Sequence, residues 1–111
     1  ALLGAANLRD LGYHFPDNDP QFKDIDSKKL LVRVIKLLND EGWKTGNIDV
    51  TVILQKPRLT NYIEPMKSKL AETMGCDPSQ VSIKATTTEK MGFTGTEEGI
   101  AAHAVALIKS E

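Results

Sequence analysis

The spacing of the hydrophobic residues changes in the middle of the chain, and this change limits the fold more than any other feature. Residues 30–38 carry leucine and valine three or four positions apart, as on one buried face of a helix. Asp26 or Ser27 can cap the start of this helix, and Gly42 follows its end. Residues 47–54 instead have isoleucine, valine and leucine at every second position, as in a half-buried strand. We therefore expect a helix that leads directly into a strand.

The next part of the chain repeats this order. Thr60 or Asn61 can cap a second helix, and Pro65 is tolerated because it lies in the first turn. Gly75 is expected to end this helix. Residues 81–85 again alternate between apolar and polar side chains, so we expect a second strand that leads into a run of threonines.

The sequence of the C-terminal tail is compatible with either a helix or a strand. The alanines of residues 100–108 favour a helix, whereas the apolar continuity also allows a strand. No linker or repeat divides the chain, so residues 1–111 are expected to form one domain of the α+β class, a small β-sheet with helices packed on one face. Because the chain opens at Ala1 inside an apolar, helix-compatible segment, we expect this domain to be N-terminally incomplete.

The charges are balanced. The 14 basic and 15 acidic residues give a formal net charge of −1, so no diffuse basic surface is expected for nucleic acid or an anionic membrane. Any phosphate must therefore be bound locally. No apolar stretch approaches the roughly 20 residues that cross a bilayer. The single cysteine, Cys76, cannot form an internal disulfide, which favours a cytoplasmic protein, or a plastid one if the source is eukaryotic.

Two polar segments are candidate sites. Asp10, Asp17 and Asp19 lie beside turns, where carboxylates can hold a cation or a sugar, or can serve only as turn and capping residues. Residues 86–88 are three threonines at the end of the second expected strand. They can surround phosphate oxygens, with Glu89 on a magnesium ion, or can simply form a turn. The sequence alone leaves both alternatives open.

The two histidines do not indicate a zinc site. His14 and His103 are far apart in the sequence, and neither belongs to a close pair of ligands such as Asp-x-His. His103 lies in the apolar tail and is expected to be a packed or interface residue.

Four ordered blocks together resemble the signature of the 2-C-methyl-D-erythritol 2,4-cyclodiphosphate synthase family. They are Asp10-Leu11-Gly12, Phe15-Pro16-Asp17-Asn18-Asp19-Pro20, Gly46-Asn47-Ile48-Asp49-Val50-Thr51 and Ala85-Thr86-Thr87-Thr88-Glu89-Lys90-Met91-Gly92-Phe93-Thr94-Gly95. The resemblance implies a homotrimer with sites between subunits, Zn²⁺ and Mg²⁺ or Mn²⁺ as cofactors, and a strand in the tail. It also implies a phosphorus–oxygen lyase of non-mevalonate isoprenoid biosynthesis, which converts 4-diphosphocytidyl-2-C-methyl-D-erythritol 2-phosphate to 2-C-methyl-D-erythritol 2,4-cyclodiphosphate and CMP.

The resemblance further implies which residues bind the substrate. They are Asp10, Leu11, Gly12, Phe15, Pro16, Asp17, Asn18, Asp19, Leu54, Gln55, Lys56, Pro57, Arg58, Leu59, Thr60, Ala85, Thr86, Thr87, Thr88, Glu89 and Phe93. Residues 10–12 would bind the methylerythritol part under a mobile cover formed by residues 15–19, and residues 54–60 would line the cytosine pocket. Thr87 would be the catalytic residue that stabilises the transition state, and Glu89 would coordinate magnesium.

One departure from the family pattern changes the expected activity. The family's zinc ligands, an Asp-x-His pair and a further histidine, belong before Ala1, so this segment alone is expected to bind the cytidine part without cyclising the substrate. Two other functions remain open. The chain can be a non-catalytic module that binds a cytidine nucleotide or a polyphosphate, or a purely structural oligomerisation domain.

Overall fold

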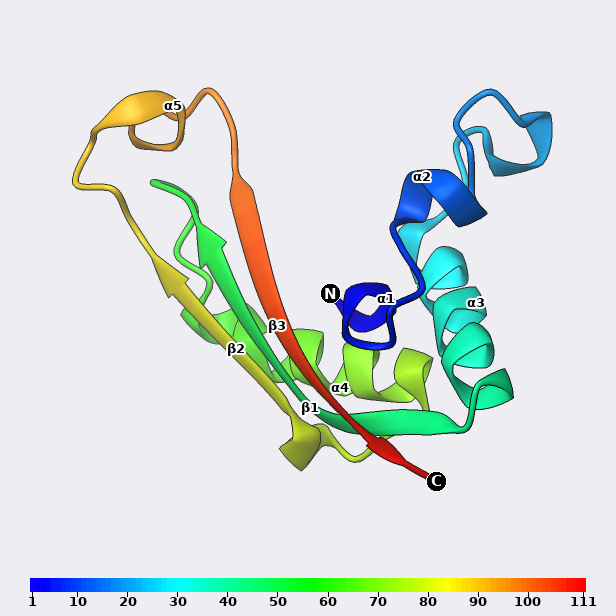
Figure 1. Ribbon diagram of the computed structural model, residues 1–111. Helices are drawn as coiled ribbons and strands as arrows, with labels where there is room; N and C mark the ends of the chain where they lie inside the picture. Colours follow the sequence, from blue (N-terminus) through cyan, green and yellow to red (C-terminus); the bar gives the residue numbers. More distant parts are fainter.

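The computed structural model describes residues 1–111 and contains a three-stranded sheet with several helices (Figure 1). The helices are α1 (Leu2–Ala5), α2 (Leu11–His14), α3 (Ser27–Asp40), α4 (Ile63–Met74) and α5 (Gly92–Gly95), and the strands are β1 (Trp43–Ile53), β2 (Val81–Thr86) and β3 (Ala101–Ser110). Short 3₁₀ turns form at Pro20–Phe22, Thr60–Tyr62 and Pro78–Gln80. The expected α+β class is confirmed. None of the helices combines the length and the apolar character needed to cross a membrane.

β1 is the central strand of the sheet. Its residues from Ile48 onward pair in parallel with β2, and its whole length pairs antiparallel with β3. A bulge interrupts the second pairing at Gly46, where a Cβ atom would lie 2.8 Å from the main-chain oxygen of Leu107. The long pairing with β1 confirms the tail as a strand in spite of its alanines, because inter-strand hydrogen bonds outweigh local helix preference.

The apolar core lies between the helices and one face of the sheet. The main cluster is Leu2, Leu3, Val34, Leu38, Ile48 and Met74, and a second cluster is Ala71, Val81 and Ile83. Ile48 and Val81 are register partners, so both clusters lie on the same face. The opposite face is open to solvent in the single chain, with Val105 and Leu107 of β3 71% and 66% exposed. Helices on one face of the sheet are therefore as expected.

The helix boundaries agree with the sequence in three of four places. The Asp26 carboxylate accepts from Lys28 N at 2.8 Å and caps α3, which ends before Gly42. α4 ends at Gly75, whose φ of 69° is left-handed. The expected cap of α4 by Thr60 or Asn61 is wrong. Both belong to a 3₁₀ turn that runs directly into the helix, so no extended capping residue precedes it.

Replacing Leu38 by alanine should lower the free energy of unfolding by about 2–5 kcal/mol, because this fully buried side chain would leave a cavity. Val32 lies on the same helix but is 52% exposed, and Val32→Ala should change the stability by less than about 0.5 kcal/mol. Urea unfolding followed by circular dichroism measures both. Equal losses in the two variants would contradict the central position of Leu38.

Candidate functional site

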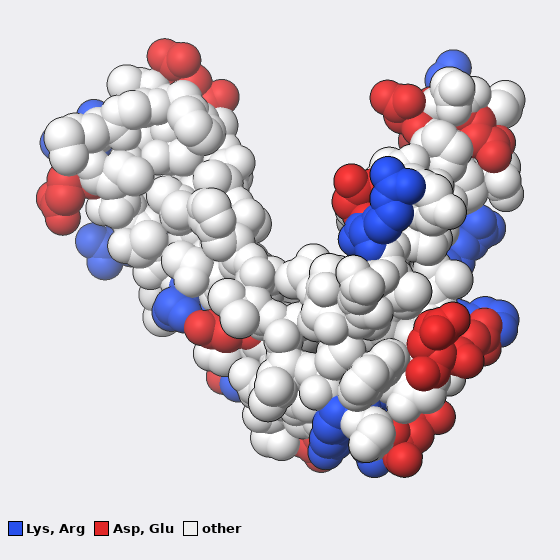
Figure 2. Space-filling view, in the orientation of Figure 1, with Lys and Arg blue, Asp and Glu red and all other residues white.

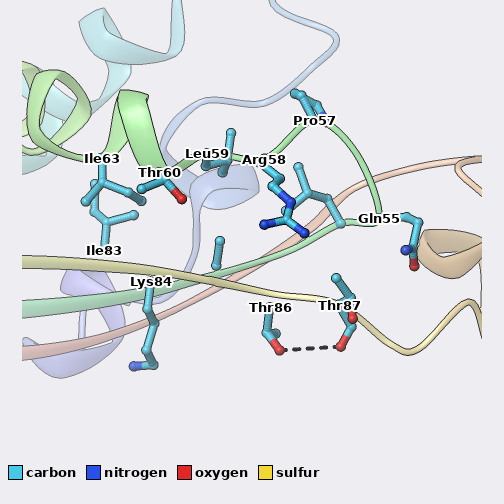
Figure 3. A pocket seen from close by; sticks show the side chains of 12 residues that line it. Gln55, Pro57, Arg58, Leu59, Thr60, Ile63, Ile83, Lys84, Thr86 and Thr87 are labelled. Atoms are coloured by element: carbon cyan, nitrogen blue, oxygen red, sulfur yellow. Dashed lines mark hydrogen bonds between the residues drawn. The ribbon is translucent and has the colours of Figure 1, made fainter.

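A cavity of about 340 Å³ lies at the edge of the sheet where β1 and β2 both end (Figure 3). Because these strands are parallel, their carboxyl ends meet at the same edge, and Leu54 N donates to Thr86 O at 3.0 Å. The loop of residues 55–60 then turns over β2 and closes one side. The lining consists of Leu54, Gln55, Pro57, Arg58, Leu59, Thr60, Ile63, Ile83, Lys84, Ala85, Thr86 and Thr87. Two segments expected to bind different parts of one ligand therefore share one cavity.

Arg58 brings a positive charge into this cavity. Its side chain points from the loop toward β1 and the end of β2 (Figure 3). None of the ion pairs of the chain involves Arg58, whereas Lys84 is bound to Asp49 at 2.6 Å. A guanidinium presents several N–H donors in one plane, which suits the oxygens of a phosphate group.

Thr86 and Thr87 are exposed where β2 ends. The Thr86 hydroxyl donates to the main-chain oxygen of Thr87 at 3.4 Å, and the Thr87 hydroxyl accepts from Glu89 N at 3.3 Å. A hydroxyl that only accepts keeps its own proton to donate. Thr87 can therefore donate a hydrogen bond to an anionic ligand in the cavity.

Glu89 follows in a turn where Glu89 and Lys90 have left-handed φ angles of 55° and 67°. Its carboxylate is exposed and takes part in no ion pair of the chain. Magnesium is usually held by one or two carboxylates together with substrate phosphates, so Glu89 fits this ion. No group of three or more His, Cys, Asp and Glu side chains could hold a metal in residues 1–111, so these residues do not fit zinc.

Other residues expected at the site, Glu89 among them, do not line the cavity. The Thr88 hydroxyl points into the protein, where it donates to a main-chain oxygen of its own turn and is bonded to the buried Thr94 hydroxyl at 3.0 Å. Phe93 is 58% exposed on α5. Lys56 pairs with Glu97 at 3.5 Å.

The acidic loop has a structural role in this chain. Asp10 caps α2 by accepting from Tyr13 N at 3.0 Å. Asp19 accepts from the side-chain amide of Gln21 at 2.8 Å and from its N–H at 3.1 Å, and these bonds lower the pKa of Asp19. Asp10 and Asp19 therefore act as capping residues in this chain, and their binding of the sugar stays a prediction.

The expected sugar-binding residues lie away from the cavity at β2. Residues 10–12 line a separate cavity of about 740 Å³ beside α1 and α3, and residues 15–19 line neither cavity. Phe15 packs edge-on against Phe22, with ring centres 5.4 Å apart. In Figure 1, α2 and the loop after it form one arm of the molecule, whereas the end of β2 and α5 form the other. One chain alone does not bring the expected groups together.

The sequence missed three lining residues, Ile63, Ile83 and Lys84. Ile83 lies on the same strand face as Ala85, so the period of two could have indicated it. Ile63 carried no such signal, because its position depends on how α4 packs beside β2. Lys84 shares the opposite face with Thr86, so the same period could have indicated it.

Comparison with known proteins gave consistent matches over almost the whole chain. A model described as the YgbB family matches residues 1–109. The 2-C-methyl-D-erythritol 2,4-cyclodiphosphate synthase of Pseudomonas syringae is 56% identical over 97% of this chain and 69% of its own length. That of Porphyromonas gingivalis is 57% identical over 97% of this chain and 67% of its own length.

Solved structures show the same fold. The bifunctional IspDF of Campylobacter jejuni matches with a TM-score of 0.95 and 39% identity, covering 100% of this chain and 30% of that one. A Plasmodium falciparum IspF in complex with CDP matches with a TM-score of 0.86 and 29% identity, covering 99% of this chain and 65% of that one.

Thr88→Val should lower the free energy of unfolding by about 1–2 kcal/mol, because it leaves the buried Thr94 hydroxyl without its partner. The same change at the exposed Thr86 should cost less than about 0.5 kcal/mol. Thermal unfolding in the absence of ligand measures both. A Thr86→Val variant that is the less stable of the two would show that the inward placement of Thr88 is wrong.

Proposed function

Because the chain belongs to the YgbB family and is similar to 2-C-methyl-D-erythritol 2,4-cyclodiphosphate synthases, we propose that its cavity binds the cytidine diphosphate end of that enzyme's substrate. The family and the synthase function expected from the sequence motifs are confirmed by relatives that are 56% and 57% identical. The substrate is 4-diphosphocytidyl-2-C-methyl-D-erythritol 2-phosphate.

One observation carries this proposal. The loop of residues 55–60 and the end of β2 form one cavity, which combines an unpaired guanidinium with exposed hydroxyls. Main-chain groups of the loop would recognise the cytosine, and Arg58, Thr86 and Thr87 would hold the diphosphate. The CDP complex of the Plasmodium falciparum relative supports this choice of ligand.

The reaction joins two anionic groups. An oxygen of the 2-phosphate attacks the β-phosphorus and forms a new P–O bond, while the bond from the β-phosphorus to the bridging oxygen breaks and CMP leaves. The attacking oxygen carries no proton, so the protein needs no general base. Arg58 would neutralise phosphate charge, and the Thr87 hydroxyl would donate to a β-phosphate oxygen, where charge collects in the transition state.

A magnesium or manganese ion fits Glu89. When bound, it would neutralise part of the diphosphate charge. Residues 1–111 do not offer a zinc site, so no step is assigned to zinc. A module that binds the nucleotide without catalysis uses the same cavity and is the second candidate. The lone Cys76 supports a reducing compartment such as the cytosol.

Adding CDP with Mg²⁺ should raise the melting temperature of the chain, because a ligand at about 100 times its Kd stabilises the folded state by roughly 2.7 kcal/mol. Thr87→Ala and Glu89→Ala should each reduce this shift, whereas Glu72→Ala on the exposed side of α4 should not. Differential scanning fluorimetry measures all four proteins. An unchanged melting curve at millimolar CDP would exclude both the enzyme and the binding module and would favour the oligomerisation domain.

We also propose that the protein is a homotrimer with sites between subunits. Residues 10–12 and the cavity at β2 lie on different arms of one chain, so a second copy would be needed to bring them together. The open face of the sheet offers a surface for this contact. Its residues Val105 and Leu107 are largely exposed, and few charged side chains lie over β3 in Figure 2.

Val105→Asp should dissociate the trimer into single chains of 12.2 kDa. The trimer would have to bury three aspartate charges, one from each subunit, without partners. Val32→Asp introduces the same charge at an exposed position of α3 and should leave the trimer intact. Sedimentation velocity gives both masses. A parent chain that sediments as a monomer would rule out the trimer.

A further inference from the structure

Gln55 connects the two segments that form the cavity. Its side-chain oxygen accepts a hydrogen bond from Lys90 N at 3.2 Å, across 35 positions of sequence. Of the side-chain hydrogen bonds in the chain, this is the one that joins the loop of residues 55–60 to the turn that carries Glu89. In Figure 3, Gln55 lies apart from Arg58 and Thr60, on the same side as Thr87.

The turn needs this support from outside. Glu89 and Lys90 both have left-handed φ angles, which cost residues with side chains roughly 1 kcal/mol or more each. Neighbouring residues bond to Glu89 N but not to Lys90 N, whose partner is Gln55. On the other side, a Cβ atom on Gly95 would collide with the Lys90 backbone. The peptide next to Glu89 is therefore held between Gln55 and α5.

A second link runs from the same loop to the segment after α5, and it is weaker. The ion pair of Lys56 with Glu97 spans 3.5 Å, and its side chains are 76% and 49% exposed. Exposed ion pairs of this kind contribute little to stability, because water screens the charges. The half-buried Gln55 is the better support for the turn.

We propose that Gln55 is a positioning residue, whose side chain fixes the turn that carries Glu89 next to the end of β2. This inference rests on the function proposed above and extends it. The Gln55 main chain belongs to the loop that meets the cytidine end, so one residue connects recognition of the nucleoside with alignment of the diphosphate. Removing its side-chain oxygen should release the turn and leave the loop in place.

Gln55→Met tests this, because methionine has a similar length and no hydrogen-bonding oxygen. Calorimetry at fixed Mg²⁺ should show CDP affinity reduced roughly three- to tenfold, as expected for one lost hydrogen bond, and CMP affinity within about twofold of the parent. Gln80→Met is the matched control. Gln80 donates to Thr45 O and Gly46 O at 3.0 Å each, far along the sheet, so its loss should lower the melting temperature and leave the CDP-to-CMP ratio unchanged.

The outcomes separate the two proposals. If the parent chain binds neither nucleotide, the proposed function is wrong, and so is the inference about Gln55. A parent that binds CDP while Gln55→Met loses CDP and CMP equally, or loses neither, overturns the positioning role alone. If Gln80→Met changes the ratio of CDP to CMP affinity in the same way, a general loss of stability explains both variants. That result would also overturn the positioning role of Gln55.

Discussion

The parallel pairing of β1 with β2 determines where this protein can bind a ligand. It brings Leu54 and Thr86 to the same edge of the sheet, where the Leu54 N–H bonds to the Thr86 oxygen. The loop after β1 and the turn after β2 then have to share the space beyond that edge. An antiparallel pairing of the same strands would send them to opposite ends. The cavity, the position of Arg58 and the exposed threonines all depend on this one arrangement.

The turn after β2 shows how the protein can present polar groups to an anion without losing order. Three threonines in a row have different roles. Thr86 and Thr87 face solvent, whereas Thr88 turns inward to the buried Thr94. The inward hydroxyl fixes the turn, so the outward ones can stay unpaired with other side chains and free for a ligand. Such preorganisation lowers the cost of ordering the site when charge develops on a phosphate.

The sequence predicted the elements better than the contacts between them. Alternation and capping located α3, β1 and β2, since these signals are local. The strand in the tail came from family resemblance, because alanine-rich segments pair as strands only when a partner such as β1 is present. The role of Thr88 and the bond from Gln55 to Lys90 could not be read from the sequence. Thr88 has the same side chain as its neighbours, and the Gln55 bond spans 35 positions.

The chemistry explains why such non-local bonds matter here. A reaction in which the substrate supplies its own nucleophile asks the protein for alignment and charge neutralisation and for no proton transfer. Alignment depends on distances between segments, and these are set by the side chains that join them. Arg58 belongs to the loop and Glu89 to the turn, so under the proposed function one diphosphate would be held by two segments. A contact between those segments therefore belongs to the site as much as the residues that touch the ligand.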